Sequence, residues 1–148
     1  MPVTGVEIRT KRPFGDGEPF GDVGPYEELS GIFRFEVDPL HSANNRVTDV
    51  GSAPLNSTGK IEFASDFTLL RPVDSEAGNG RLLFDVLNRG RKAALGTYNE
   101  AETGAPGLYP FPSEDSFDEA ATHFSYSDDF MDPGNGWLMR NGWTVLWT

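Results

Sequence analysis

A compact basic cluster of this chain lies at Arg89, Arg91 and Lys92. The surrounding sequence is acidic, with 23 Asp and Glu against 12 Lys and Arg and a formal net charge of -11. Because the planar guanidinium of arginine matches a carboxylate with two hydrogen bonds, the cluster is a candidate binding site for a substrate carboxylate. The alternative is that these side chains pair with nearby acidic residues or cap a helix.

Other residue types that perform acid–base or metal chemistry have no recognisable partners in the sequence. His41 follows a turn and His123 lies in an acidic stretch, so we interpret both as solvated loop histidines rather than general bases. The run Asp128-Asp129-Phe130-Met131-Asp132 offers oxygen ligands, but its spacing does not match a calcium loop. We therefore predict no metal and no cofactor.

The composition narrows the class of protein. The chain has 148 residues and no cysteine, which excludes disulfides, thiolate zinc sites and a cysteine nucleophile. The first residues lack the basic flank and apolar core of a secretory signal, and no apolar run is long enough to span a membrane. The negative charge disfavours binding to nucleic acid or anionic membranes. These features predict a soluble cytoplasmic protein.

The first half of the chain alternates apolar and polar residues with a period of two. Such alternation is typical of half-buried strands, because successive side chains on a strand point to opposite faces. Residues 13–17 and 21–25 are rich in Gly and Pro and predict loops, and residues 56–59 predict a turn. Pro72 closes the third strand. The sequence thus predicts an antiparallel sheet whose apolar positions include Val6, Ile8, Phe33, Phe35, Val37, Ile61, Phe63, Phe67 and Leu69.

Two short apolar runs follow, at residues 82–87 and 143–147. Nearly continuous apolar runs are typical of strands buried on both faces of a parallel sheet. A helix is predicted before the second run, with Asp132 as N-cap, Pro133 at the first helical position and Gly142 at the left-handed stop. This order is a βαβ unit. Residues 96–131 predict a long acidic loop. Phe130 and the three tryptophans, Trp137, Trp143 and Trp147, are interpreted as core residues rather than as the lining of a ligand pocket.

Four stretches carry a resemblance to one family. The first runs from Val6-Glu7-Ile8-Arg9 to Pro13-Phe14 and continues at residues 20–27. The other three run from Asp66 to Pro72, from Asp85 to Lys92, and from Gly134 to Trp147. The chain resembles the start of the poorly characterised α/β-hydrolase domain proteins, which open with a β-rich lead-in. The resemblance implies a β-rich α/β fold, with a lead-in at residues 1–75 and the first βαβ unit of an incomplete hydrolase sheet at residues 76–148.

The resemblance also implies an activity and a site. In this fold a loop after one strand supplies a backbone N–H to the oxyanion hole, which makes Asn88-Arg89-Gly90 the oxyanion-loop candidate. The alternative is a plain turn with Gly90 at positive φ. No Gly-x-Ser-x-Gly occurs in the sequence, and Ser57 in Leu55-Asn56-Ser57-Thr58-Gly59 lacks both the first glycine and the strand-to-helix context.

The predicted function is therefore that of the N-terminal portion of an ester or acyl hydrolase that is inactive by itself. In the full-length form its substrate would be a small ester-type molecule. The alternatives are a non-catalytic β-sheet interaction module, which self-associates through the unfinished sheet, or an incomplete gene product.

Overall fold

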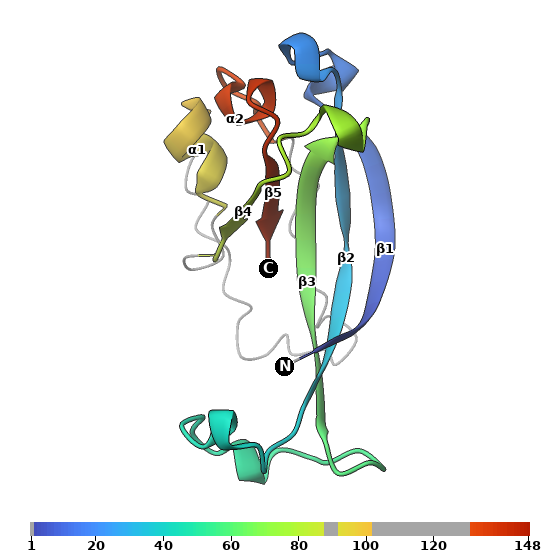
Figure 1. Ribbon diagram of the computed structural model, residues 1–148, viewed down its shortest axis with the longest axis vertical. Helices are drawn as coiled ribbons and strands as arrows, with labels where there is room; N and C mark the ends of the chain where they lie inside the picture. The colour runs from blue at the N-terminus through green and yellow to red at the C-terminus, as the bar shows by residue number, and fades with distance from the viewer. Residues whose placement is uncertain (1, 88–91, 102–130) are drawn as a thin grey trace, which may run out of the picture.

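The structure is a computed structural model that describes residues 2–87, 92–101 and 131–148. In this part of the chain five strands form one mixed sheet in the order β1-β2-β3-β5-β4 (Figure 1). The chain is thus a β-rich α/β protein with few helices. The strands are β1 (Val3–Phe14), β2 (Tyr26–Val37), β3 (Ile61–Pro72), β4 (Leu82–Asp85) and β5 (Thr144–Trp147), and the helices are α1 (Ala94–Asn99) and α2 (Trp137–Arg140).

The three long strands β1, β2 and β3 form an antiparallel meander, as the alternating sequence predicts. The prediction that each strand is half-buried is wrong for β1, where Val6 (58%) and Ile8 (57%) are exposed because the helices do not cover that part of the sheet. Four of the aromatic residues in the meander share one face, because residues paired across neighbouring strands point to the same side of a sheet. On that face the rings of Phe33 and Phe67 stack with centroids 4.2 Å apart, and those of Phe35 and Phe63 stack at 4.9 Å. The predicted turn at residues 56–59 and the end of β3 at Pro72 are both confirmed.

The predicted loop at residues 13–17 is wrong for its first two residues. Pro13 and Phe14 belong to β1, where Phe14 pairs with Tyr26 and is buried. A proline is tolerated there because β1 is an edge strand. On the side of an edge strand that has no neighbouring strand, a missing N–H removes no hydrogen bond. The long-range contact of Phe14 overrides the local turn signal.

The two apolar runs form a parallel pair, which confirms the predicted βαβ arrangement. Leu82 pairs with Thr144 and Asp85 pairs with Trp147, in parallel register. On its other side β5 pairs antiparallel with β3. The predicted regions 1–75 and 76–148 therefore share one sheet.

The prediction that both apolar runs are buried on both faces is wrong for β4. Among the strands of the described residues this one is the outermost, so β5 is its only neighbour there. Its strand pairing ends at Asp85, although the apolar run continues to Leu87. The face turned away from the helices leaves three large apolar side chains about half exposed or more: Leu82 (54%), Phe84 (52%) and Val86 (67%).

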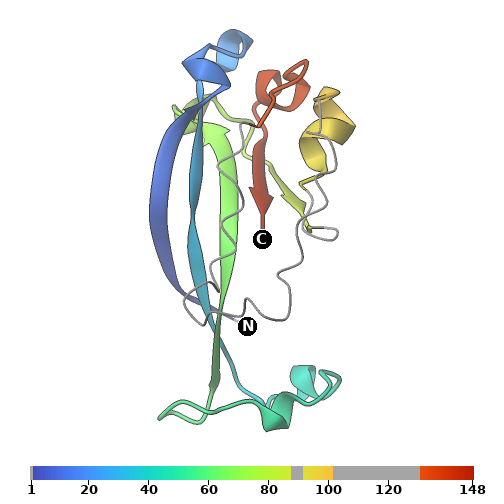
Figure 2. The same ribbon diagram turned by 180° about the vertical axis from the view of Figure 1, so that it is seen from behind.

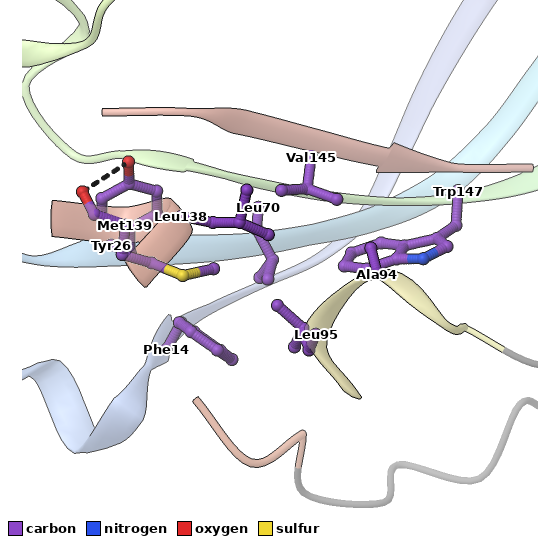
Figure 3. Packing of buried hydrophobic residues seen from close by; sticks show 9 residues of the cluster. All are labelled: Phe14, Tyr26, Leu70, Ala94, Leu95, Leu138, Met139, Val145 and Trp147. Carbon is purple, nitrogen blue, oxygen red and sulfur yellow. Dashed lines mark hydrogen bonds between the residues drawn. The ribbon is translucent and has the colours of Figure 1, made fainter. Parts of the chain in front are cut away.

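The helices cover the opposite face of the sheet. Both views place α1 and α2 on the side of the molecule where β4 and β5 lie (Figure 1, Figure 2). The core between helices and sheet draws residues from six elements (Figure 3). Its buried members are Phe14, Tyr26, Leu70, Ala94, Leu95, Leu138, Met139, Val145 and Trp147.

The helix before β5 begins later than the sequence predicts. Asp132 does not cap it; its Oδ1 accepts the N–H of Gly134 at 2.8 Å in a local turn, and α2 starts only at Trp137. Side chains of this kind compete with helix formation by bonding nearby backbone. The predicted stop is confirmed. Gly142 has φ 72°, and the N–H groups of Gly142 and Trp143 donate to the carbonyls of Met139 and Leu138, which is a Schellman motif.

Helix α1 occupies residues that the sequence assigns to the long acidic loop. It runs from Ala94 to Asn99 and therefore includes the first four residues of the predicted loop 96–131. The fully buried Asn99 attaches this short helix to the segment that contains α2. Its Nδ2 donates to the Pro133 carbonyl at 2.9 Å, and its Oδ1 accepts the N–H of Leu138 at 2.9 Å. Residues 102–130 of the predicted loop lie outside the described residues.

Candidate functional site

The carboxyl ends of the parallel strands meet at Asp85 on β4 and Trp147 on β5, which are paired. The Oδ2 atom of Asp85 accepts three hydrogen bonds: from the indole Nε1 of Trp147 at 2.8 Å, and from the N–H groups of Ala93 at 3.0 Å and Ala94 at 2.8 Å. Ala93 has no side-chain oxygen with which to cap α1, so the preceding strand supplies the cap. One carboxylate thus connects β4, β5 and α1.

Lys92 lies two residues before the start of α1 and extends over the helix-covered face of the sheet. Its Nζ donates to Oγ1 of Thr68 at 2.9 Å and lies 5.7 Å from the ring centroid of Trp147. Burial lowers the pKa of Lys92, the carboxylate of Glu28 raises it, and the guanidinium of Arg12 lowers it; the net direction is downward. Lys92 is the one member of the predicted basic cluster that the structure describes.

Glu28 and Arg12 continue the polar arrangement across the sheet. They are paired on β2 and β1, and the guanidinium of Arg12 lies 2.9 Å from the carboxylate of Glu28, which is only 6% exposed. The neighbouring hydroxyls of Thr10 and Ser30 are hydrogen-bonded to each other. We call the set on the helix-covered face the polar strip, made of Arg12, Glu28, Thr68, Asp85 and Lys92.

The polar strip can do two kinds of chemistry. Its cations can hold an anionic group such as a carboxylate. An amine whose pKa is lowered supplies more of its unprotonated, nucleophilic form near neutral pH. Open α/β sheets bind ligands at the carboxyl ends of their strands, and Asp85 and Trp147 are the last residues of β4 and β5.

The other predicted site residues are distributed as follows. Asn88, Arg89, Gly90 and Arg91 lie outside the described residues, as do His123 and residues 128–130. His41 is exposed and its Nδ1 accepts the N–H of Ala43 at 3.1 Å, capping a 3-10 turn. Ser57 is exposed in the turn before β3, at the end of that strand away from Leu70 and Pro72.

The tryptophans are divided between core and surface. Trp147 is fully buried and Trp143 is partly buried, as predicted for core residues. Trp137 is 46% exposed, so its assignment to the core is wrong. It is the first residue of α2, and the buried positions of that helix are Leu138 and Met139.

Sequence reasoning missed four members of the polar strip as site residues: Arg12, Glu28, Thr68 and Asp85. A signal existed for Asp85, which is the only charged residue in the apolar run 82–87. A lone carboxylate in such a run must find hydrogen-bond donors when the strand is packed. Arg12 and Glu28 carry no such signal, because only the strand register brings them together.

A second ionic group lies on the opposite face of the same strands. The carboxylate of Glu27, which is 3% exposed, lies 2.7 Å from Nζ of Lys11 and 2.8 Å from the guanidinium of Arg71. Burial raises the pKa of Glu27, but the two cations outweigh it, and the net direction is downward. Each residue lies on a different strand, so the group fastens β1, β2 and β3 together.

Within the described residues, no group of three or more His, Cys, Asp or Glu side chains is arranged to hold a metal ion. No helix in the same part of the chain is both long and apolar enough to cross a bilayer. Comparisons with family models, with curated proteins and with solved structures find no match to this chain.

Proposed function

We propose that this chain is the N-terminal portion of an α/β-hydrolase-like protein that acts on small ester or acyl substrates. The observation that supports the proposal is the parallel pair of β4 and β5, which follows antiparallel strands in the same sheet and is connected through α1 and α2. In the hydrolase plan, a strand, an oxyanion loop and a helix come before the turn that carries the nucleophile. The order β4, residues 88–91 and α1 agrees with that plan.

Described residues lie on both sides of positions 88–91 in the sequence. Asp85 precedes them, and its carboxylate binds the N–H groups of Ala93 and Ala94 that follow them. An oxyanion site needs donors that are fixed before the reaction, since preorganised dipoles stabilise developing charge without rearrangement. On this proposal Asn88, Arg89 and Gly90 form the oxyanion loop, and Arg89, Arg91 and Lys92 contact a substrate carboxylate. A cytoplasmic location is part of the same proposal.

The proposal assigns the nucleophile to residues outside this sequence, because the 148 residues contain no Gly-x-Ser-x-Gly. The test is to read the coding frame beyond Thr148, to express the longer product, and to assay both forms with p-nitrophenyl acetate and butyrate. The chain alone should release p-nitrophenol at the buffer rate. The longer product should accelerate it and lose that activity when the serine of its Gly-x-Ser-x-Gly becomes alanine.

Two outcomes would contradict this assignment. One is a longer reading frame that carries no Gly-x-Ser-x-Gly. The other is ester turnover by the 148-residue chain that a single serine substitution abolishes, with Ser57→Ala as the first variant to examine.

A second candidate function is that of an interaction module that associates by strand pairing. The observation that favours it is the outer edge of β4, which pairs with no other strand of the described residues and where Leu82, Phe84 and Val86 are exposed. Edge strands of this kind pair with other chains unless charges protect them. Light scattering should then show dimers that Phe84→Lys dissociates, with Val47→Lys, at another exposed position, as the control. A concentration-independent monomer would exclude self-association.

A further inference from the structure

Three asparagines of this chain are followed directly by glycine: Asn79, Asn135 and Asn141. In such a pair the side-chain amide reacts readily with the next backbone nitrogen, because glycine has no Cβ to obstruct the approach. We propose that Asn79 is a site of covalent modification in the folded chain, where it deamidates through a cyclic imide, and that the fold protects the other two asparagines. This inference does not depend on ester hydrolysis.

The attacking atom is the backbone nitrogen of the glycine, and its surroundings differ among the three pairs. The N–H of Gly136 donates to the Pro133 carbonyl at 3.0 Å, and that of Gly142 donates to the Met139 carbonyl at 2.9 Å. Both of these glycines are buried. Gly80 is exposed, and its N–H donates to no acceptor in the part of the chain that the structure describes. A buried, hydrogen-bonded N–H must open before it can lose its proton to water, whereas the N–H of Gly80 is already open.

The side chain of Asn79 is folded back over the residue that follows it. Its Oδ1 accepts the N–H of Arg81 at 2.8 Å, which is an Asx turn. A donor on this oxygen stabilises the negative charge that develops there when nitrogen attacks the amide carbon. Asn135 forms the same kind of turn, because its Oδ1 accepts the N–H of Trp137 at 2.9 Å. The turn therefore does not distinguish the two asparagines, and the N–H of the following glycine does.

The space beside each glycine differs in the same sense. Apart from its chain neighbours, a Cβ added at Gly80 would meet no atom within 4 Å. A Cβ at Gly136 would lie 2.9 Å from the ring of Phe20, and one at Gly142 would lie 2.8 Å from the backbone nitrogen of Asn79. Ring closure thus has room at Gly80 and would displace packed atoms at the other two glycines.

The reaction needs only water as a co-reactant. The backbone nitrogen of Gly80 loses its proton and attacks Cγ of Asn79; a C–N bond forms, and the side-chain nitrogen takes a proton and leaves as ammonia. Water then adds to one carbonyl of the cyclic imide and breaks its bond to the ring nitrogen. Opening at the side-chain carbonyl gives aspartate, and opening at the main-chain carbonyl gives isoaspartate. In both products the Nδ2 group that donates to the Asn141 carbonyl is lost.

The test is to incubate the folded chain at pH 8.5 and 37 °C and to follow the three Asn-Gly peptides over time by mass spectrometry. Asn79 should be converted first, because opening one hydrogen bond slows the other two sites about fivefold or more. In urea that unfolds the chain, this advantage should disappear. The proposal is overturned if Asn135 or Asn141 reacts as fast as Asn79 in the folded chain, or if the advantage of Asn79 is unchanged in urea.

Two further measurements separate exposure of the glycine N–H from other causes. Amide hydrogen exchange should be unprotected at Gly80 and protected at Gly136 and Gly142, and protection at Gly80 would overturn the proposal. Isoelectric focusing of the incubated chain should show an acidic form that accumulates early. The variant Asn79→Asp should not accumulate it, and the matched control Asn135→Asp should. Equal early accumulation in Asn79→Asp would also overturn the proposal.

Discussion

Replacing Asp85 with alanine removes three hydrogen bonds that join a strand edge, a helix start and a buried indole. Two of the donors are buried: Ala94 is 3% exposed and Trp147 is fully buried. Ala93 is exposed, so water can replace the acceptor at its N–H. A hydrogen bond to a charged acceptor contributes about 1.5 kcal/mol or more, and a buried donor left without a partner loses a similar amount. Two such donors give a loss of about 3 kcal/mol in the free energy of unfolding.

The assay is urea unfolding at pH 7 followed by tryptophan fluorescence, with the midpoint and slope fitted together. Asp85→Asn should recover part of the loss, because the amide oxygen still accepts one bond. Asp74→Ala is the matched control, since Asp74 also accepts a backbone N–H, from Glu76 at 3.0 Å, but does so at an exposed turn. Equal losses in Asp85→Ala and Asp74→Ala would refute the role given to Asp85.

Three other substitutions test the packing of the sheet. The Tyr26 hydroxyl lies 3.0 and 3.2 Å from two carbonyls before β5, so Tyr26→Phe should lower stability by about 1 kcal/mol. Burial raises the pKa of Tyr26, so stability should fall above pH 10 in urea unfolding, and less steeply in that variant. Glu27→Gln should lower the free energy of unfolding at pH 7. The difference between this variant and the unchanged chain should become smaller on acidification, because the lowered pKa of Glu27 stabilises the fold above about pH 4.5. Gly31→Ala places Cβ 1.9 Å from the Glu7 carbonyl oxygen and should cost about 2 kcal/mol or more in thermal unfolding, whereas Gly51→Ala meets no atom within 4 Å.

The strands could be predicted from the sequence because their signal is local. Alternation in β1, β2 and β3 follows from side chains pointing to opposite faces, and it survives whatever the strand order is. The two apolar runs likewise predict a parallel pair. The exposure of Phe84 could not be predicted, because it depends on β4 being the outermost strand, and strand order is a property of the whole sheet.

The helix starts were missed for a different reason. Asp132 and Pro133 form a good N-terminal signal, but Gly134 and Gly136 adopt positive φ and Asn135 accepts the N–H of Trp137 at 2.9 Å. The chain therefore turns before the helix begins. In α1 the cap comes from Asp85 in a preceding strand, which no rule about adjacent residues can detect.

The candidate site was predicted only in part. The basic cluster pointed to Lys92, and the structure places that amine beside Trp147 and Thr68. Its electrostatic surroundings include Arg12 and Glu28, about 80 and 64 positions earlier in the sequence numbering. Contacts over such separations are fixed by register and cannot be read from spacing.

The parallel pairing of β4 and β5 is the claim on which the account depends, and cysteine cross-linking tests it directly because the chain has no cysteine of its own. Leu82 is paired with Thr144, and Phe84 with Leu146. Paired positions fall within the Cα distance that a disulfide allows, whereas diagonal positions are about 8 Å apart and do not.

Four double-cysteine variants should be oxidised in the folded state and compared by mass spectrometry. The parallel register predicts disulfides in the 82/144 and 84/146 variants and none in the 82/146 and 84/144 variants. Disulfides in the second pair of variants and not in the first would show antiparallel strands and contradict the account.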